Sequence, residues 1–88
     1  MRAREITLDA RDLEPPEPYE LATATLIKLQ PGEYVRMIIP RQPRLLYPWL
    51  VEHGYSETTR QISDELFEIY IWDSDDADTE NVIKKLLS

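Results

Sequence analysis

The segment from Leu8 to Pro18 joins the first predicted strand to the first predicted helix, and we expect any chemistry to lie near it. A helix N-terminus often binds anions, because its first backbone N–H groups have no partner within the helix. Here three carboxylates, Glu14, Glu17 and Glu20, already occupy that positive field. The sequence therefore argues against a phosphate ligand at this junction.

Three arginines, Arg36, Arg41 and Arg44, form the basic cluster of note. Guanidinium groups could clamp a carboxylate or a phosphate through paired hydrogen bonds. They could equally be solvated or ion-paired, which is the interpretation we favour. The candidate ion-pair partners are Glu14, Glu17 and Glu52. The predicted ligand or partner patch comprises Arg11, Glu17, Arg36, Arg41 and Arg44.

Two further sites have structural explanations that we prefer to chemical ones. Asp9 and Arg11 could form an acid and its anchor, but an aspartate before a turn usually accepts backbone N–H bonds. His53 ends the second predicted helix, where a partly charged imidazole suits the helix dipole. One histidine with scattered carboxylates is too few for a transition-metal site, and the acidic run 73–80 lacks the order of a calcium loop. We expect no cofactor, no metal and no enzymatic activity.

Four aromatic residues, Tyr47, Trp49, Tyr70 and Trp72, could form an exposed recognition surface. Aromatic residues at such spacings usually belong to a core, so we expect at least two to be buried. If Tyr70 and Trp72 face outward on an uncovered sheet, a protein interface becomes attractive. The alternative is that a C-terminal helix covers them.

The hydrophobic pattern predicts strands over 4–9, 33–39, 55–61 and 66–72, with helices over 16–30 and 45–53. A final helix over 80–87 would be capped by Asp78 or Thr79. The order β-α-β-α-β-β, followed by the helix, predicts an α+β fold, a two-layer α/β sandwich with both earlier helices on one sheet face. The other face should be partly open. We expect a domain over 1–73, then an acidic linker and helix over 74–88.

Composition limits the classes of function. With 88 residues, 42% of them hydrophobic, the chain supports one domain with a modest core. The net charge of −7 disfavours nucleic acid or an anionic membrane as partner. The absence of cysteine removes disulfides, thiolate metal ligands and cysteine nucleophiles. With no signal peptide or membrane-spanning run, we expect a cytoplasmic protein.

Several motifs between about residues 5 and 73 resemble a known family. They are Leu8-Asp9-Ala10-Arg11-Asp12-Leu13, Pro15-Pro16-Glu17-Pro18, Leu29-Gln30-Pro31-Gly32-Glu33, Arg41-Gln42-Pro43, Leu46-Tyr47-Pro48 and Glu52-His53-Gly54-Tyr55. The chain resembles TusA/SirA-like proteins, above all the uncharacterised TusA-like domains of domain-of-unknown-function family twenty-two forty-nine. The resemblance implies their two-layer α/β fold, with the C-terminal helix outside the match.

The resemblance also informs function. TusA-type sulfur carriers have a Cys-Pro-x-Pro motif at the start of the first helix, and here Pro15 stands at the cysteine position, so persulfide transfer there is chemically excluded. Other family members carry a histidine in the loop after the second strand, where this chain has Arg41. We therefore expect a non-catalytic binding or adaptor module whose partner is another protein. The alternative is a small-ligand or redox and metal-linked accessory domain, associated with nitrogen-oxide or oxygen metabolism.

Overall fold

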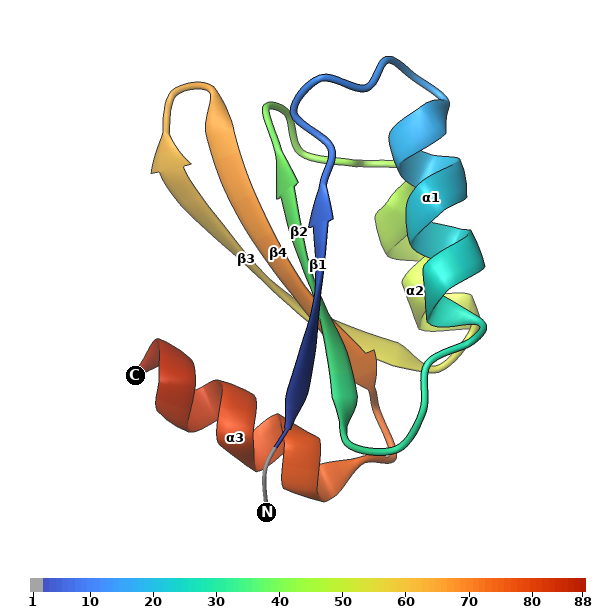
Figure 1. Cartoon of the computed structure of the whole chain (residues 1–88), viewed down its shortest axis with the longest axis vertical. Coiled ribbons are helices and arrows are strands. Elements are labelled where there is room, and N and C mark those ends of the chain that lie inside the picture. Colours follow the sequence, from blue (N-terminus) through green and yellow to red (C-terminus); the bar gives the residue numbers. More distant parts are fainter. Residues whose placement is uncertain (1–2) are drawn as a thin grey trace.

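The computed structural model describes residues 3–88 as one four-stranded sheet with three helices (Figure 1). The strands are β1 (Arg4–Asp9), β2 (Glu33–Ile39), β3 (Tyr55–Ser63) and β4 (Leu66–Asp73). The helices are α1 (Glu17–Leu26), α2 (Leu46–Glu52) and α3 (Ala77–Leu87). This order confirms the predicted α+β fold with a C-terminal helix.

The sheet has the order β1-β2-β4-β3. β1 and β2 are parallel, since α1 carries the chain back between them, whereas β4 is antiparallel to both β2 and β3. The apolar run of β2 predicts a central strand, and β2 indeed lies between β1 and β4. Because β1 and β2 are parallel, their carboxyl ends lie at one edge, where both strands lead into helices.

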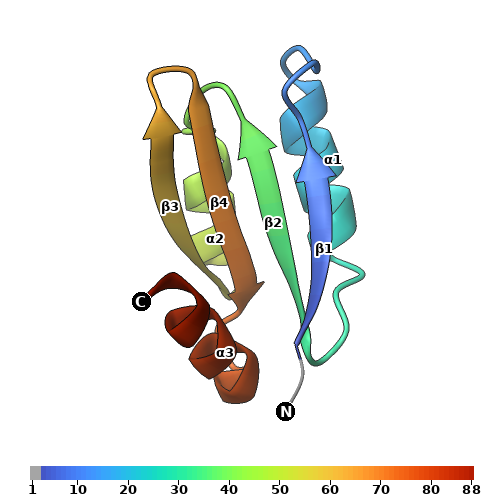
Figure 2. The ribbon, with the colours of Figure 1, turned by 60° about the vertical axis from the view of Figure 1, so that its left-hand side comes forward.

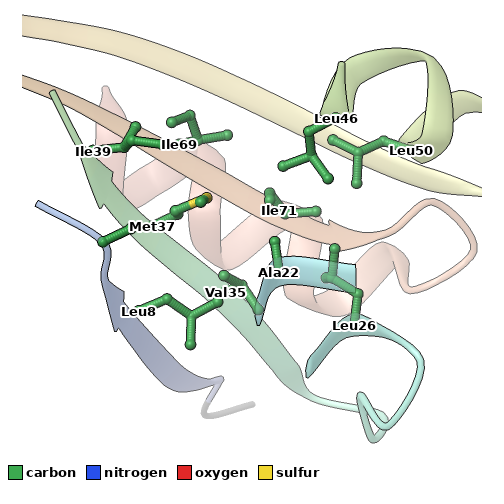
Figure 3. Close-up of a cluster of buried hydrophobic side chains, with 11 residues drawn as sticks. Leu8, Ala22, Leu26, Val35, Met37, Ile39, Leu46, Leu50, Ile69 and Ile71 are labelled. Atoms are coloured by element: carbon green, nitrogen blue, oxygen red, sulfur yellow. The ribbon is translucent and has the colours of Figure 1, made fainter. Parts of the chain in front are cut away.

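The main core lies between the sheet and the pair α1 and α2 (Figure 3). Alternate residues of the central strands point to this side, as the period of a strand requires. The fully buried members from the sheet are Val35, Met37, Ile69 and Ile71, and those from the helices are Ala22, Leu26, Leu46 and Leu50. The two helices thus form one layer on one face, as the sequence predicts.

α3 packs on the opposite face of the sheet (Figure 2). It places Ile83 against Tyr34, Tyr70 and Trp72, and all four side chains are buried. Trp72 also donates a hydrogen bond from its indole Nε1 to Glu80, at 3.2 Å. The expectation that at least two of the four aromatic residues are buried is therefore confirmed. Of the two alternatives for Tyr70 and Trp72, the structure has the one in which the C-terminal helix covers them.

α1 ends four residues earlier than predicted. After Leu26 the chain forms tighter bonds of the 3₁₀ type, from Lys28 N to Thr25 O and from Leu29 N to Leu26 O. The Leu26 carbonyl also accepts a hydrogen bond from the Tyr55 hydroxyl, at 2.8 Å. This contact from β3 takes up a helix-end carbonyl, which a prediction from local sequence could not include.

α3 begins three residues before the predicted start, and neither Asp78 nor Thr79 is its cap. The N-cap is Asp76, whose carboxylate accepts hydrogen bonds from the Thr79 backbone N–H and hydroxyl. The same carboxylate accepts the Gly32 N–H, at 2.9 Å. Residue 76 therefore joins the start of α3 to the turn before β2, so the segment after β4 is a short structured connection.

Other boundaries agree closely with prediction. α2 is one residue shorter than predicted at each end, because Leu45 and His53 are its N-cap and C-cap residues. β3 runs two residues further, to Ser63, and leaves Asp64 and Glu65 as the turn. Within residues 3–88, no helix is both long and apolar enough to cross a membrane.

Candidate functional site

A groove of about 500 Å³ lies where the start of α1 faces the loop between β2 and α2. We call it the α1-loop groove. Its lining residues are Pro15, Pro16, Pro18, Tyr19, Ile39, Arg41, Gln42, Pro43, Arg44, Leu45 and Leu46. Most of these side chains are apolar, and the charged ones are two arginines. The groove thus combines an apolar lining with local positive charge in an acidic protein.

One wall is the start of α1, and prolines determine its chemistry. Pro16 is the N-cap and Pro18 is the second helical residue, so neither offers a backbone N–H. Two nearby N–H groups are already bonded, from Glu17 to Glu14 O at 2.9 Å and from Glu20 to Pro16 O at 3.1 Å. This helix start is therefore poor in the free donors that bind anions, in agreement with the sequence argument against phosphate.

The opposite wall is the loop between β2 and α2. It is folded by backbone bonds from Arg44 N to Gln42 O, at 3.0 Å, and from Leu46 N to Pro43 O, at 2.9 Å. Arg41 and Arg44 are both exposed, and no ion pair among residues 3–88 includes either of them. Leu45 is 81% exposed. This wall presents two guanidinium groups and one large apolar side chain to solvent.

Of the five residues in the predicted patch, only Arg41 and Arg44 line the groove. Glu17 is exposed at the first position of α1, beside the lining prolines but not among the lining residues. Arg11 lies in the turn after β1 and is ion-paired with Asp9. The structure therefore brings together two of the three arginines of the predicted basic cluster with residues that were not predicted to belong to it.

The Asp9 carboxylate has the structural role that the sequence predicts. It accepts the Arg11 backbone N–H at 3.2 Å, and the Arg11 guanidinium donates to both of its oxygens, at 2.9 and 2.7 Å. These hydrogen bonds lower the pKa of Asp9 to about 2, and the same contact raises the pKa of Arg11. A carboxylate so stabilised in its charged form is a poor general base.

Arg36 lies on the other face of the sheet, away from the main core. Its Nε donates to Glu68 at 2.7 Å, and its Nη1 lies 3.8 Å from Glu5. The hydrogen bond to Glu68 is the main cause that raises the pKa of Arg36. The predicted partners Glu14, Glu17 and Glu52 are therefore wrong for this residue. The sheet register determines the partner of Arg36, because Arg36 pairs with Tyr70 and therefore lies next to Glu68 on β4.

His53 is the C-cap of α2, as predicted. Its Nδ1 lies 2.8 Å from the Trp49 carbonyl, and the two rings stack with centroids 4.2 Å apart. Trp49 in turn stacks on Tyr55, at 5.7 Å. Across residues 3–88 no three His, Cys, Asp or Glu side chains lie close enough together to hold a metal ion.

The sequence argument missed the apolar part of the groove. The helical spacing of Tyr19 from Ala22 and Leu26 predicts a buried side chain, whereas Tyr19 is only partly buried and lines the groove. Leu45 was predicted to lie within the second helix, whereas it is the N-cap residue of α2 and its side chain is exposed to solvent. The available signal was the pair of proline-rich segments, 15–18 at the start of α1 and 40–43 shortly before α2.

The comparisons with known proteins identify a family. The model of the family described as Uncharacterized conserved protein (DUF2249) matches residues 7–73, which is most of the chain. The chain therefore belongs to this family, as the motifs predict. The search of curated proteins and the search of solved structures each gave no match. The matched range includes both walls of the α1-loop groove and ends before α3.

Proposed function

We propose that this member of the DUF2249 family is a non-catalytic binding module that holds a segment of another protein in the α1-loop groove. The observation that carries the proposal is the exposed apolar lining, with Leu45 at its rim. Exposing a leucine to this degree gains nothing for the fold, and covering it would remove apolar surface from water. A concave site lined mainly by apolar side chains, with a few polar groups at fixed positions, is the usual form of a binding site.

The residues that could do chemistry support a binding role over catalysis. Pro15 offers no nucleophile, and Asp9 is held in its ionised form by Arg11. The walls of the groove supply apolar contacts, guanidinium groups and the polar ends of Tyr19 and Gln42. Such a set can orient a bound chain, but it lacks a paired acid and base.

The test compares two substitutions near α2, each of which replaces an exposed apolar side chain with serine. Leu45→Ser removes the apolar rim of the groove, and Val51→Ser removes an apolar side chain of similar exposure, 79%, outside it. Each tagged full chain is used to capture proteins from a lysate of the host, and each captured protein is then purified and titrated against both variants by calorimetry. We expect a partner that binds the wild type and Val51→Ser equally, and Leu45→Ser at least about tenfold more weakly. Equal binding by all three proteins would reject the groove as the binding site.

A second candidate function is the binding of a small molecule in the same groove. Its volume, about 500 Å³, lies within the range of small-ligand sites. Native mass spectrometry of the protein purified from its host would decide between them. A stoichiometric adduct below about 1 kDa, absent from Leu45→Ser, would favour this second function. The metal-linked alternative stays an expectation from family resemblance.

A further inference from the structure

We infer that the segment recognised by the α1-loop groove is a peptide that carries carboxylate side chains next to bulky apolar ones. This inference rests on the proposed function and names the chemical class of its partner. It follows from the hydrogen-bond donors of the groove, which has few free backbone N–H groups but two arginine side chains.

The backbone of the groove offers few donors to a partner. Four of its lining residues, Pro15, Pro16, Pro18 and Pro43, have no N–H group. The N–H groups of Arg44 and Leu46 are bonded within the loop. A partner that relied on main-chain pairing, as an added β-strand does, would find little to pair with here. Specific polar recognition must therefore come from side chains.

The side-chain donors are dominated by Arg41 and Arg44. An arginine carries five N–H donors and no acceptor, and its planar fork matches a carboxylate through two parallel hydrogen bonds. Elsewhere in the described chain Arg11 makes such a contact with Asp9, and Arg36 approaches a single carboxylate oxygen of Glu68 through two of its nitrogens. Arg41 and Arg44 form no ion pair within residues 3–88, so their charge is available to a carboxylate from outside.

Charge also distinguishes the groove from the rest of the protein. The chain has a net charge of −7, yet the charged residues that line the groove are both positive. A basic peptide would meet repulsion from the arginines at the point of contact, whereas an acidic peptide would be paired there. The apolar lining, with Leu45 and Ile39 among its members, requires large apolar side chains beside those carboxylates.

The test selects peptides from a random display library of about twelve residues, with the full chain as bait. We expect enrichment of Asp or Glu within a few positions of Leu, Ile, Phe or Trp. Synthetic copies should bind Arg41→Glu/Arg44→Glu at least about tenfold more weakly than wild type, and their affinity should fall with rising salt. The matched control is Lys28→Glu/Lys85→Glu, which reverses two exposed charges outside the groove and should leave the affinity unchanged.

A charge swap makes the test specific. A peptide whose acidic residues are replaced by lysine should bind the Arg41→Glu/Arg44→Glu chain better than it binds wild type. The inference would be overturned if the enriched peptides were uncharged or basic. It would also be overturned if they bound Arg41→Glu/Arg44→Glu as tightly as wild type but no longer bound Leu45→Ser. In both cases the groove would still be a binding site. If no enriched peptide required Leu45 for binding, the result would contradict both the inferred peptide class and the proposed function of the groove.

Discussion

At the scale of single residues, the Asp76 carboxylate connects two parts of the chain that are far apart in sequence. It accepts hydrogen bonds from Gly32 N at 2.9 Å, from Thr79 N at 3.1 Å and from the Thr79 hydroxyl at 2.7 Å. These bonds, with the Gly32 contact as the largest cause, lower the pKa of Asp76. A single side chain thus caps α3 and ties it to the turn before β2.

Replacing Asp76 with alanine should lower the free energy of unfolding by about 1–3 kcal/mol, because a helix cap is lost and the Gly32 N–H loses its partner. The matched control is Asp78→Ala, an exposed carboxylate in the same helical turn, which should cost less than about 1 kcal/mol. Urea unfolding followed by far-ultraviolet circular dichroism measures both. Equal losses in the two variants would contradict the role assigned to Asp76.

The same contacts predict a dependence on pH. The folded pKa of Asp76 lies below the ordinary value of 3.8, so its contribution is fully present above that value and is lost as pH falls through the folded pKa. Asp76→Asn keeps a capping side chain but cannot ionise. Between about pH 5 and pH 2, wild type should therefore lose more unfolding free energy than Asp76→Asn does. Parallel pH profiles for the two proteins would reject this.

Arg36 provides a second prediction at this scale, because the sequence groups it with Arg41 and Arg44 whereas the structure separates them. Arg36→Gln should leave the affinity of a selected peptide within about twofold of wild type, while Arg41→Gln weakens it severalfold. The stability cost of Arg36→Gln should stay near 1 kcal/mol, since its ion pairs are partly exposed. Peptide titration by fluorescence anisotropy measures the affinities, and a comparable loss in Arg36→Gln would return Arg36 to the binding site.

At the scale of elements, α3 depends on its docking. It has eleven residues, too few to be stable alone in water, and its buried side chains, Thr79 and Ile83, face the sheet. Ile83 is 1% exposed, whereas Leu86 on the same helix is 53% exposed. The apolar residues of one helix therefore differ greatly in what they contribute to stability.

Ile83→Ala should lower the free energy of unfolding by about 2–4 kcal/mol, because it opens a cavity against Tyr34, Tyr70 and Trp72. Leu86→Ala, the matched control, should cost less than about 1 kcal/mol. Thermal unfolding of each variant, followed by tryptophan fluorescence, provides the comparison. The midpoint should also be independent of protein concentration, since α3 packs on its own chain. A midpoint that rises with concentration would instead indicate docking between copies.

The elements differ in how well the sequence predicts them, and the reason is the range of the interactions that end them. β2 and β4 were predicted to within one residue, because their alternating or continuous apolar residues form a local pattern. The end of α1 was missed because the Tyr55 hydroxyl, 29 residues away, bonds the Leu26 carbonyl. The start of α3 was missed because the acidic run 73–80 offers several possible N-caps, and the bond that sets Asp76 apart from the others comes from Gly32, 44 residues away. The sequence grouped Arg36 with Arg41 and Arg44, because it does not reveal the sheet register that places Arg36 beside Glu68.

At the scale of the whole molecule, the groove and α3 lie at opposite ends of the sheet (Figure 1). The connections that lead from β1 to α1 and from β2 to α2 form one end, and α3 crosses the other. Their side chains also belong to separate apolar clusters on the two faces of the sheet. Sites so separated, with no shared contacts, usually respond independently to substitution.

This separation predicts that Ile83→Ala, although destabilising, leaves the affinity of the groove for a selected peptide within about twofold of wild type. The peptide should in turn raise the unfolding midpoint of wild type and of Ile83→Ala by a similar amount in free energy, because ligand binding adds the same term to each folded state. Leu45→Ser should show the opposite behaviour to Ile83→Ala: its peptide affinity should fall, whereas its free energy of unfolding should be nearly unchanged. Calorimetric titration and thermal unfolding with and without peptide measure both quantities. If Ile83→Ala weakened peptide binding as strongly as Leu45→Ser, the two ends would be coupled through the sheet, and α3 would be part of the binding mechanism rather than a separate cover for the aromatic face.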